Sequence, residues 1–96
     1  GAVVSGTFAA QYDLALANVV EALSAAGGQP DHIVSVVVYT TSMQAYRDDL
    51  PGVGAAHRRH LGRHFPAMAM LGVTELFEAA AQVEIVATAV IPARGS

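Results

Sequence analysis

The sequence predicts an α+β fold in which one sheet carries two helices on the same face. Apolar residues recur at helical spacing in residues 9–26, and three runs of strand length occupy residues 33–40, 68–73 and 83–91. Strands that are joined through helices need right-handed crossovers, which place both helices on one side of the sheet. The chain has 96 residues, which is the size of a single domain.

The first part of the chain predicts a strand stub and then a helix. Val3 and Val4 form the stub, which Ser5-Gly6 interrupts. The helix of residues 9–26 has an apolar stripe at positions i, i+3 and i+4, made of Tyr12, Leu16, Val19, Val20 and Leu23. Gly27-Gly28 should end this helix, because glycine readily adopts the left-handed conformation of a C-terminal cap.

The middle of the chain predicts a buried strand and a second helix. Residues 33–40, IVSVVVYT, are β-branched and nearly unbroken, which is typical of a strand covered on both faces. Thr41 or Ser42 can cap the helix that follows. Pro51-Gly52 should loosen its early turns, and Pro66 should end it. Its inward face would consist of Tyr46, Leu50, Val53, His57 and Leu61.

The predicted strands are apolar on both sides, which indicates an oligomer. Strict alternation in residues 33–40 would place Val34, Val36 and Val38 on one face, and Ile33, Val37 and Tyr39 on the other. Two helices cover only one face, so we expect another subunit on the second. The composition supports this expectation, since 53% of the residues are hydrophobic and only 14% are charged.

Composition also excludes several classes of function. The chain has no cysteine, which rules out disulfides, thiolate metal sites and a cysteine nucleophile. Its net charge is −3 and it contains no lysine, which argues against a nucleic-acid partner. It has no run of 18 apolar residues and no signal-peptide pattern, so we expect a cytoplasmic protein without a membrane partner.

Glu84 is the candidate catalytic residue that the sequence alone singles out. It lies in the apolar run VEIVATAV, on the face formed by Glu84, Val86, Thr88 and Val90. A carboxylate in such surroundings loses solvation, so its pKa should rise and it can act as general acid and base near neutral pH. The alternative is a glutamate on an edge strand that reaches water or pairs with an arginine, since structural pairs also perturb acids.

The histidines of HRRHLGRH have only a weak metal pattern. His60 and His64 show the i, i+4 spacing of a helical metal pair, and His57 precedes them by one turn. No carboxylate motif accompanies them, and interleaved arginines at positions 58, 59 and 63 add repulsive charge. A packed or solvated helix face is the simpler interpretation. The sequence therefore predicts no metal site and no cofactor, and this basic patch is too short to indicate nucleic-acid binding.

Five stretches together resemble the RidA/YjgF/L-PSP family, in order and over residues 3–92. They are VVSG (3–6), QYDLALANVVEALSAAGG (11–28), DHIVSVVVYTTSM (31–43), FPAMAMLGV (65–73) and VEIVATAVIP (83–92). The resemblance implies a chorismate-mutase-like fold, three subunits that pack their sheets inward, and a ligand cleft at each subunit interface. Residues 1–92 would then form a single domain of this type, and residues 93–96 a tail.

The resemblance also implies an activity and its residues. Deaminating members hydrolyse reactive 2-imino and 2-enamino acids to 2-oxo acids and ammonia, and their acid–base glutamate falls on Glu84. Their cleft is lined by positions that correspond to Ser5, Gly6, Met68, Ala69 and Met70. The arginine that clamps the substrate carboxylate falls on Met68, and Met70 stands where a small Cys or Ser is common. Because methionine offers only polarizable apolar contact, we expect a pocket for a neutral or apolar imine or enamine.

Relatives in that family have further strand residues before VVSG and a longer segment after it, whereas here only Thr7-Phe8 separate Gly6 from Ala9. Either the chain is abridged there or residues are missing from the sequence. Three functions stay open: a trimeric imine or enamine hydrolase, a non-catalytic small-molecule-binding or chaperone-like trimer, and an RNA-directed translation inhibitor or endoribonuclease. The acidic balance and the lack of an aromatic stacking platform disfavour the third.

Overall fold

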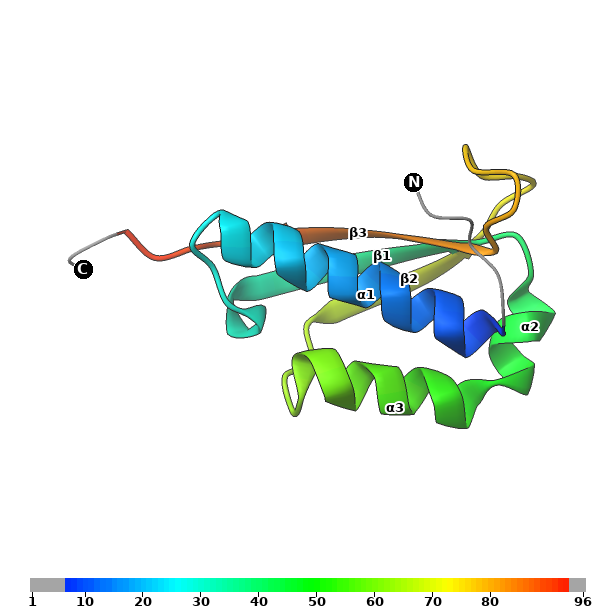
Figure 1. Cartoon of the computed structure of the whole chain (residues 1–96), viewed down its shortest axis with the longest axis horizontal. Coiled ribbons are helices and arrows are strands. Elements are labelled where there is room, and N and C mark those ends of the chain that lie inside the picture. The colour runs from blue at the N-terminus through cyan, green and yellow to red at the C-terminus, as the bar shows by residue number, and fades with distance from the viewer. Residues whose placement is uncertain (1–6, 94–96) are drawn as a thin grey trace.

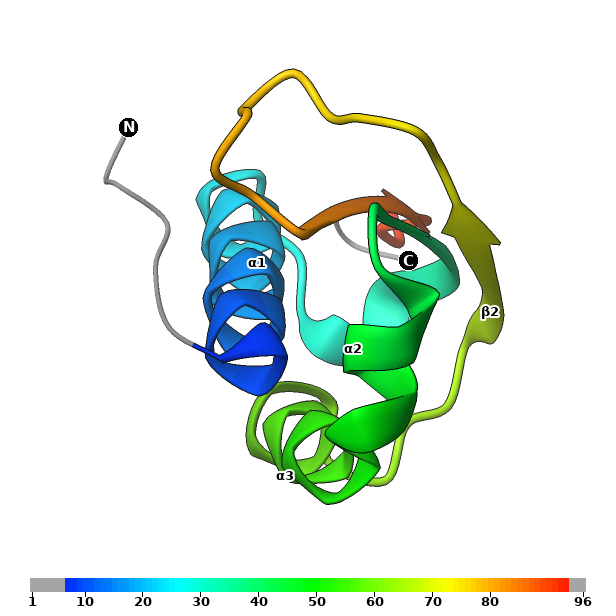
Figure 2. The ribbon, with the colours of Figure 1, turned by 90° about the vertical axis from the view of Figure 1, so that its right-hand side faces the viewer.

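The computed structural model describes residues 7–93, and the strand stub expected at Val3 and Val4 lies outside them. Three helices accompany a mixed three-stranded sheet (Figure 1). In chain order the elements are α1 (Phe8–Ala25), a 3-10 turn (Pro30–His32), β1 (Ile33–Thr40), α2 (Met43–Asp48), α3 (Leu50–Leu61), β2 (Ala67–Gly72) and β3 (Val83–Ala89). Helices α1 and α3 lie side by side on one face of the sheet (Figure 2), which confirms the predicted fold class.

Helix α1 is held at both ends by interactions that satisfy its terminal backbone groups. The Thr7 hydroxyl accepts a hydrogen bond from the Ala10 amide at 3.1 Å. The Asp49 carboxylate reaches across from the α2–α3 junction and accepts one from the Ala9 amide at 2.9 Å. After the helix, Gly27 has a φ of 88°. The predicted stop at Gly27-Gly28 is therefore confirmed.

The second predicted helix is divided into α2 and α3. Ser42, one of the two expected caps, accepts a hydrogen bond from the Ala45 amide at 3.1 Å. The helix breaks at Asp49, just before the Pro51-Gly52 pair that was expected to loosen it. The prediction that Pro66 ends this segment is wrong. Helix α3 stops at Leu61 because Gly62 adopts a φ of 60°, which glycine tolerates better than other residues.

The sheet has the strand order β2-β1-β3, in which β1 runs parallel to β2 and antiparallel to β3. A β-bulge shifts the register between Ile33 and Ser35. Ile33 therefore faces the helices and is only 1% exposed, whereas Val34 is 48% exposed. The strict alternation predicted from the sequence is wrong at these two residues and holds from Val36 onward.

The other face of the sheet is covered by no helix of residues 7–93, and we call it the open face. Its side chains come from all three strands and include Val37, Tyr39, Ala69, Leu71, Glu84, Val86 and Thr88. Leu71 and Val86 are each about half exposed there, at 47% and 51%. The surface that the sequence assigned to another subunit is therefore largely apolar, and nothing in the described helices covers it.

None of the helices within residues 7–93 is both long enough and apolar enough to span a bilayer.

Candidate functional site

Met68 and Glu84 lie on opposite faces of the sheet. Met68 pairs with Val36 and Met70 with Val38, so both methionines face the helices. Glu84 pairs with Tyr39 and lies on the open face. Strand β1 separates β2 from β3, and neighbouring strands are about 4.8 Å apart. Side chains that lie two strands apart and on opposite faces cannot meet, so Glu84 and Met68 share no site within one chain.

The expected burial of Glu84 is not achieved by a single chain. The alternation of β3 does place Glu84, Val86 and Thr88 on one face, as predicted. That face is the open one, however, and Glu84 is exposed on it. Any desolvation of its carboxylate must therefore come from a second copy or from a ligand.

Two polar side chains fix the backbone just before Glu84. The Gln11 side-chain oxygen accepts a hydrogen bond from the Gln82 amide at 2.8 Å, and the Thr40 hydroxyl donates one to the Gln82 carbonyl at 2.7 Å. Gln11 is 6% exposed and Thr40 is fully buried. Sequence analysis gave neither residue a role. The available signal was a polar residue next to the apolar stripe of α1, because such a residue needs a partner when buried.

Glu84 also borders a cavity of about 420 Å³ at the edge of β3, between α1 and the loop of residues 73–82. The polar residues that line it are Gln11, Asn18, Glu78 and Glu84. This cavity is separate from the one that contains the methionines, so the structure distributes the predicted site residues over two places.

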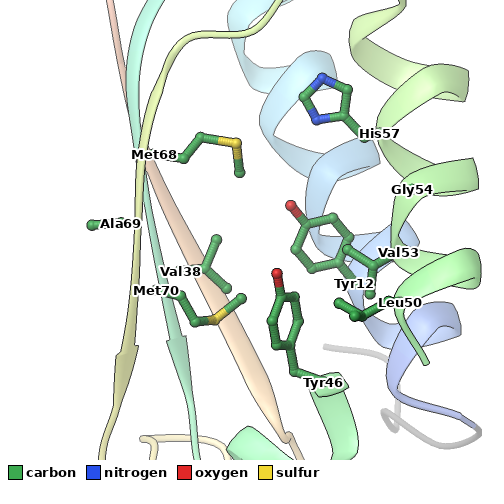
Figure 3. Close-up of a pocket in the computed structure, with 10 residues that line it drawn as sticks. All are labelled: Tyr12, Val38, Tyr46, Leu50, Val53, Gly54, His57, Met68, Ala69 and Met70. Carbon is green, nitrogen blue, oxygen red and sulfur yellow. The ribbon is translucent and has the colours of Figure 1, made fainter. Parts of the chain in front are cut away.

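Met68 and Met70 point into a cavity of about 380 Å³ between β2 and α3, which we call the methionine cavity (Figure 3). Figure 3 shows the side chain of Ala69 turned away from it. Among residues 7–93, none that lines it is an Asp, Glu, Lys or Arg; the lining residues are Tyr12, Val38, Tyr46, Leu50, Val53, Gly54, His57, Met68, Ala69 and Met70. An uncharged lining offers no counter-charge to an ion, so this cavity suits a neutral ligand.

Tyr12 is the buried phenol of the methionine cavity. It is 2% exposed, and its ring stacks on that of Phe8 with centroids 6.3 Å apart. Burial, and secondarily the neighbouring phenol of Tyr46, raises the pKa of Tyr12 to about 12. Sequence analysis had assigned Tyr12 only to the apolar stripe of α1.

This pKa predicts how stability depends on alkaline pH. A tyrosine in the unfolded chain titrates near pH 10, so Tyr12 stabilises the fold fully below that pH and loses its contribution as pH rises toward 12. Tyr12→Phe should therefore reduce the fall in melting temperature between pH 9.5 and 11, as measured by circular dichroism. If the melting temperature falls equally in the variant and the wild type over this pH range, the raised pKa of Tyr12 is contradicted.

The histidines hold protein atoms in place. His57 Nε2 lies 2.9 Å from the His64 carbonyl, and His64 Nε2 lies 2.7 Å from the Ile33 carbonyl. His60 Nε2 lies 2.9 Å from the Asp13 carboxylate, which also pairs with Arg59. Within residues 7–93, no group of three His, Asp or Glu side chains is arranged to hold a metal ion. These contacts tie α3 to β1 and to α1, which is a structural role.

Ser5 and Gly6, the two remaining predicted site residues, lie outside the residues that the structure describes.

Comparison with known proteins identifies the family. The family model described as Endoribonuclease L-PSP matches residues 1–91. Among curated proteins, none matches the chain.

Solved structures agree with that assignment. A Thermotoga maritima protein is 32% identical with a TM-score of 0.81, and the match covers 97% of this chain and 69% of that one. A member of the YjgF/YER057c/UK114 family from Mycobacterium tuberculosis is 33% identical with a TM-score of 0.77, covering 91% and 71%. The YjgF gene product of E. coli is 30% identical with a TM-score of 0.74, covering 91% and 67%. From its sequence match and its fold, the chain belongs to the YjgF/L-PSP family.

Proposed function

We propose that the protein hydrolyses reactive, uncharged imines or enamines to carbonyl compounds and ammonia. The observation that carries the proposal is the methionine cavity, which has no charged lining residue in the described part of the chain and has Met68 where the resemblance places a carboxylate clamp. Family membership supports the reaction type. The missing clamp supports a neutral substrate. Without the arginine, a substrate carboxylate loses two charge-assisted hydrogen bonds, each of which contributes roughly 1.5–3 kcal/mol to its binding free energy.

The proposed site is shared between two copies of the chain. Glu84 and Met68 cannot meet within one chain, so Glu84 of one copy would reach the mouth of another copy's methionine cavity. There Glu84 would take a proton from the attacking water as the carbon–oxygen bond forms and pass it to the imine nitrogen, which gives a neutral carbinolamine. It would then take the proton of the new hydroxyl and pass it to the same nitrogen as the carbon–nitrogen bond breaks, so that both hydrogens of water leave in ammonia and the oxygen stays in the carbonyl product. An enamine enters this sequence once a proton has moved from its nitrogen to its β-carbon, which makes it the imine. Ser5, Gly6 and the backbone at Ala69 complete the proposed substrate contacts. No metal or cofactor takes part in the proposed steps.

The assembly that we propose is a homotrimer built on the open face. Its support is the apolar character of that face, where Leu71 and Val86 are each about half exposed. Packing of a second copy there would also supply the desolvation that Glu84 lacks in one chain. We further propose a cytoplasmic location, in keeping with a sequence that has no cysteine for the disulfides of exported domains.

A non-catalytic binding trimer is the second candidate. One observation favours it: residues of a single chain line the methionine cavity, whereas Glu84 needs another copy to approach it. An RNA-directed role, to which the family description Endoribonuclease L-PSP refers, is the third. The net charge of −3 weighs against that role.

The deciding experiment follows ammonia release from one imine supplied in two forms, as the free 2-carboxylate and as its neutral amide. We expect kcat/KM for the amide to exceed that for the acid at least tenfold, after the spontaneous rate is subtracted. A preference for the acid would contradict the role given to Met68, and would point to an arginine such as Arg58, Arg59 or Arg63 of a neighbouring copy. No turnover of either form would contradict the hydrolase and favour the binding trimer.

A further inference from the structure

Two side chains of the methionine cavity are almost fully buried, and each has one polar atom that forms no hydrogen bond with any of residues 7–93. They are Tyr12, which is 2% exposed, and His57, which is 8% exposed. Every fully enclosed side-chain nitrogen or oxygen in that part of the chain has a partner. The Tyr12 hydroxyl and the second ring nitrogen of His57 are therefore reached from the cavity, toward which both are turned in Figure 3.

Hydrogen bonding decides which of these two atoms donates and which accepts. His57 Nε2 lies 2.9 Å from the His64 carbonyl oxygen, and a carbonyl only accepts, so Nε2 carries the proton. In the neutral ring, Nδ1 is then an acceptor. Because burial raises the pKa of Tyr12 to about 12, its hydroxyl keeps its proton at neutral pH and donates. These two buried side chains thus present one donor and one acceptor, beside the hydroxyl of the partly exposed Tyr46, which also lines the cavity.

The remaining lining decides what kind of molecule can use this pair. Buried polar groups are unfavourable unless something bonds to them, and a single hydroxyl can satisfy both by accepting from Tyr12 and donating to His57. A ketone or ether only accepts, and an ion meets no counter-charge. The thioethers of Met68 and Met70 make favourable contacts with aromatic rings. At about 380 Å³ the cavity has the size of a site for a small molecule.

We infer that the methionine cavity binds an uncharged aromatic group bearing a hydroxyl, held by Tyr12 and His57. As a statement about the substrate, this inference rests on the proposed function: the hydrolase would act on an imine or enamine with a hydroxylated aromatic substituent. Tyr12 and His57 then determine specificity, because they touch the substituent and not the carbon–nitrogen bond that is hydrolysed.

The test is direct binding of two probes that differ only in the hydroxyl, 4-ethylphenol and ethylbenzene. The whole chain, labelled with ¹³C at the methionine methyl groups, gives three NMR signals, from Met43, Met68 and Met70. Aromatic rings shift nearby methyl signals, so 4-ethylphenol should move those of Met68 and Met70. Met43 does not line the cavity and should stay unchanged as an internal control. Ethylbenzene should bind roughly three- to tenfold more weakly.

Two variants sharpen the assignment. Tyr12→Phe removes the donor but keeps the ring, so the affinity for 4-ethylphenol should fall to that for ethylbenzene. Tyr39→Phe makes the same change on the open face and should bind 4-ethylphenol as the wild type does. The comparison of the two probes on the wild-type chain needs neither variant and decides the inference even if Tyr12→Phe does not fold.

Equal affinities for the two probes, or no shift at Met68 and Met70, would overturn the inference. The outcome is separable from that of the imine assay. Imine turnover without binding of 4-ethylphenol would overturn the inference alone. Binding of 4-ethylphenol without turnover of any imine would overturn the proposed hydrolase alone and leave the cavity assigned.

Discussion

Replacing Glu84 with glutamine should abolish imine hydrolysis and leave the oligomer intact. Glutamine keeps the shape and hydrogen-bonding reach of the side chain but cannot take a proton from water. A positioned acid–base group typically contributes about 10²–10⁴-fold to a rate, so we expect a loss of that order in kcat. Ammonia release measures the rate, and analytical ultracentrifugation of the same sample measures the assembly.

Glu75→Gln is the matched control, because it makes the same change on an exposed residue of the loop before β3. It should retain wild-type activity. The idea that two copies share the site has its own check: mixing Glu84→Gln chains with Met68→Trp chains, whose cavities are blocked, should restore part of the activity. Undiminished hydrolysis by Glu84→Gln would remove the residue from the mechanism.

Introducing an arginine at Met68 should convert the preference for the neutral amide into one for the free 2-carboxylate. Met68 is 44% exposed at the cavity mouth, so an arginine there can keep its guanidinium in contact with water and ligand. A bidentate pair with a carboxylate adds two charge-assisted hydrogen bonds, which we expect to shift the acid-to-amide ratio of kcat/KM by roughly 10²–10⁴.

Met68→Gln controls for this change, since it adds polarity without charge and should shift the ratio little. A folded Met68→Arg protein that still prefers the amide would show that the substrate carboxylate does not approach residue 68. The thermal stability of each variant is measured alongside, so that loss of fold is not mistaken for loss of preference.

Local patterns in the sequence predict the elements well. The β-branched run at 33–40 is β1 to the residue, because seven of its eight residues are strong strand formers. Helix α1 is displaced by only one residue from the predicted range, because Gly27-Gly28 ends it through local backbone geometry. The end of the second helical segment was misplaced because proline was taken as the stop, whereas Gly62 ends α3 four residues earlier.

Relations between strands could not be predicted in the same way. The bulge after Ile33 reverses which of Ile33 and Val34 is buried, and no residue type in that run signals it. The sequence shows which residues of β2, and which of β3, share a face. Which of the two faces lies toward the helices depends on how each strand pairs with β1. That Met68 and Glu84 lie on opposite faces of the sheet is shown only by the register of the three strands.

The sequence places the donor and the acceptor of the methionine cavity correctly but does not show their role. Tyr12 and His57 both occupy inward positions of otherwise apolar helix faces. Helical spacing alone cannot tell a core tyrosine whose hydroxyl is bonded from one whose hydroxyl opens on a cavity. That distinction depends on which side chains of β2 stand opposite, and these come from a distant part of the chain.

The central position of β1 also bears on how the protein is made. This strand emerges from the ribosome before both of the strands that flank it in the finished sheet. Its sequence, IVSVVVYT, carries no charge and no proline, which is the composition of segments that form intermolecular β-structure. Helix α1 is already complete at that stage and can cover one side of the run. Until β2 and β3 follow, however, both edges of β1 are open, and the nascent chain is then most prone to aggregate.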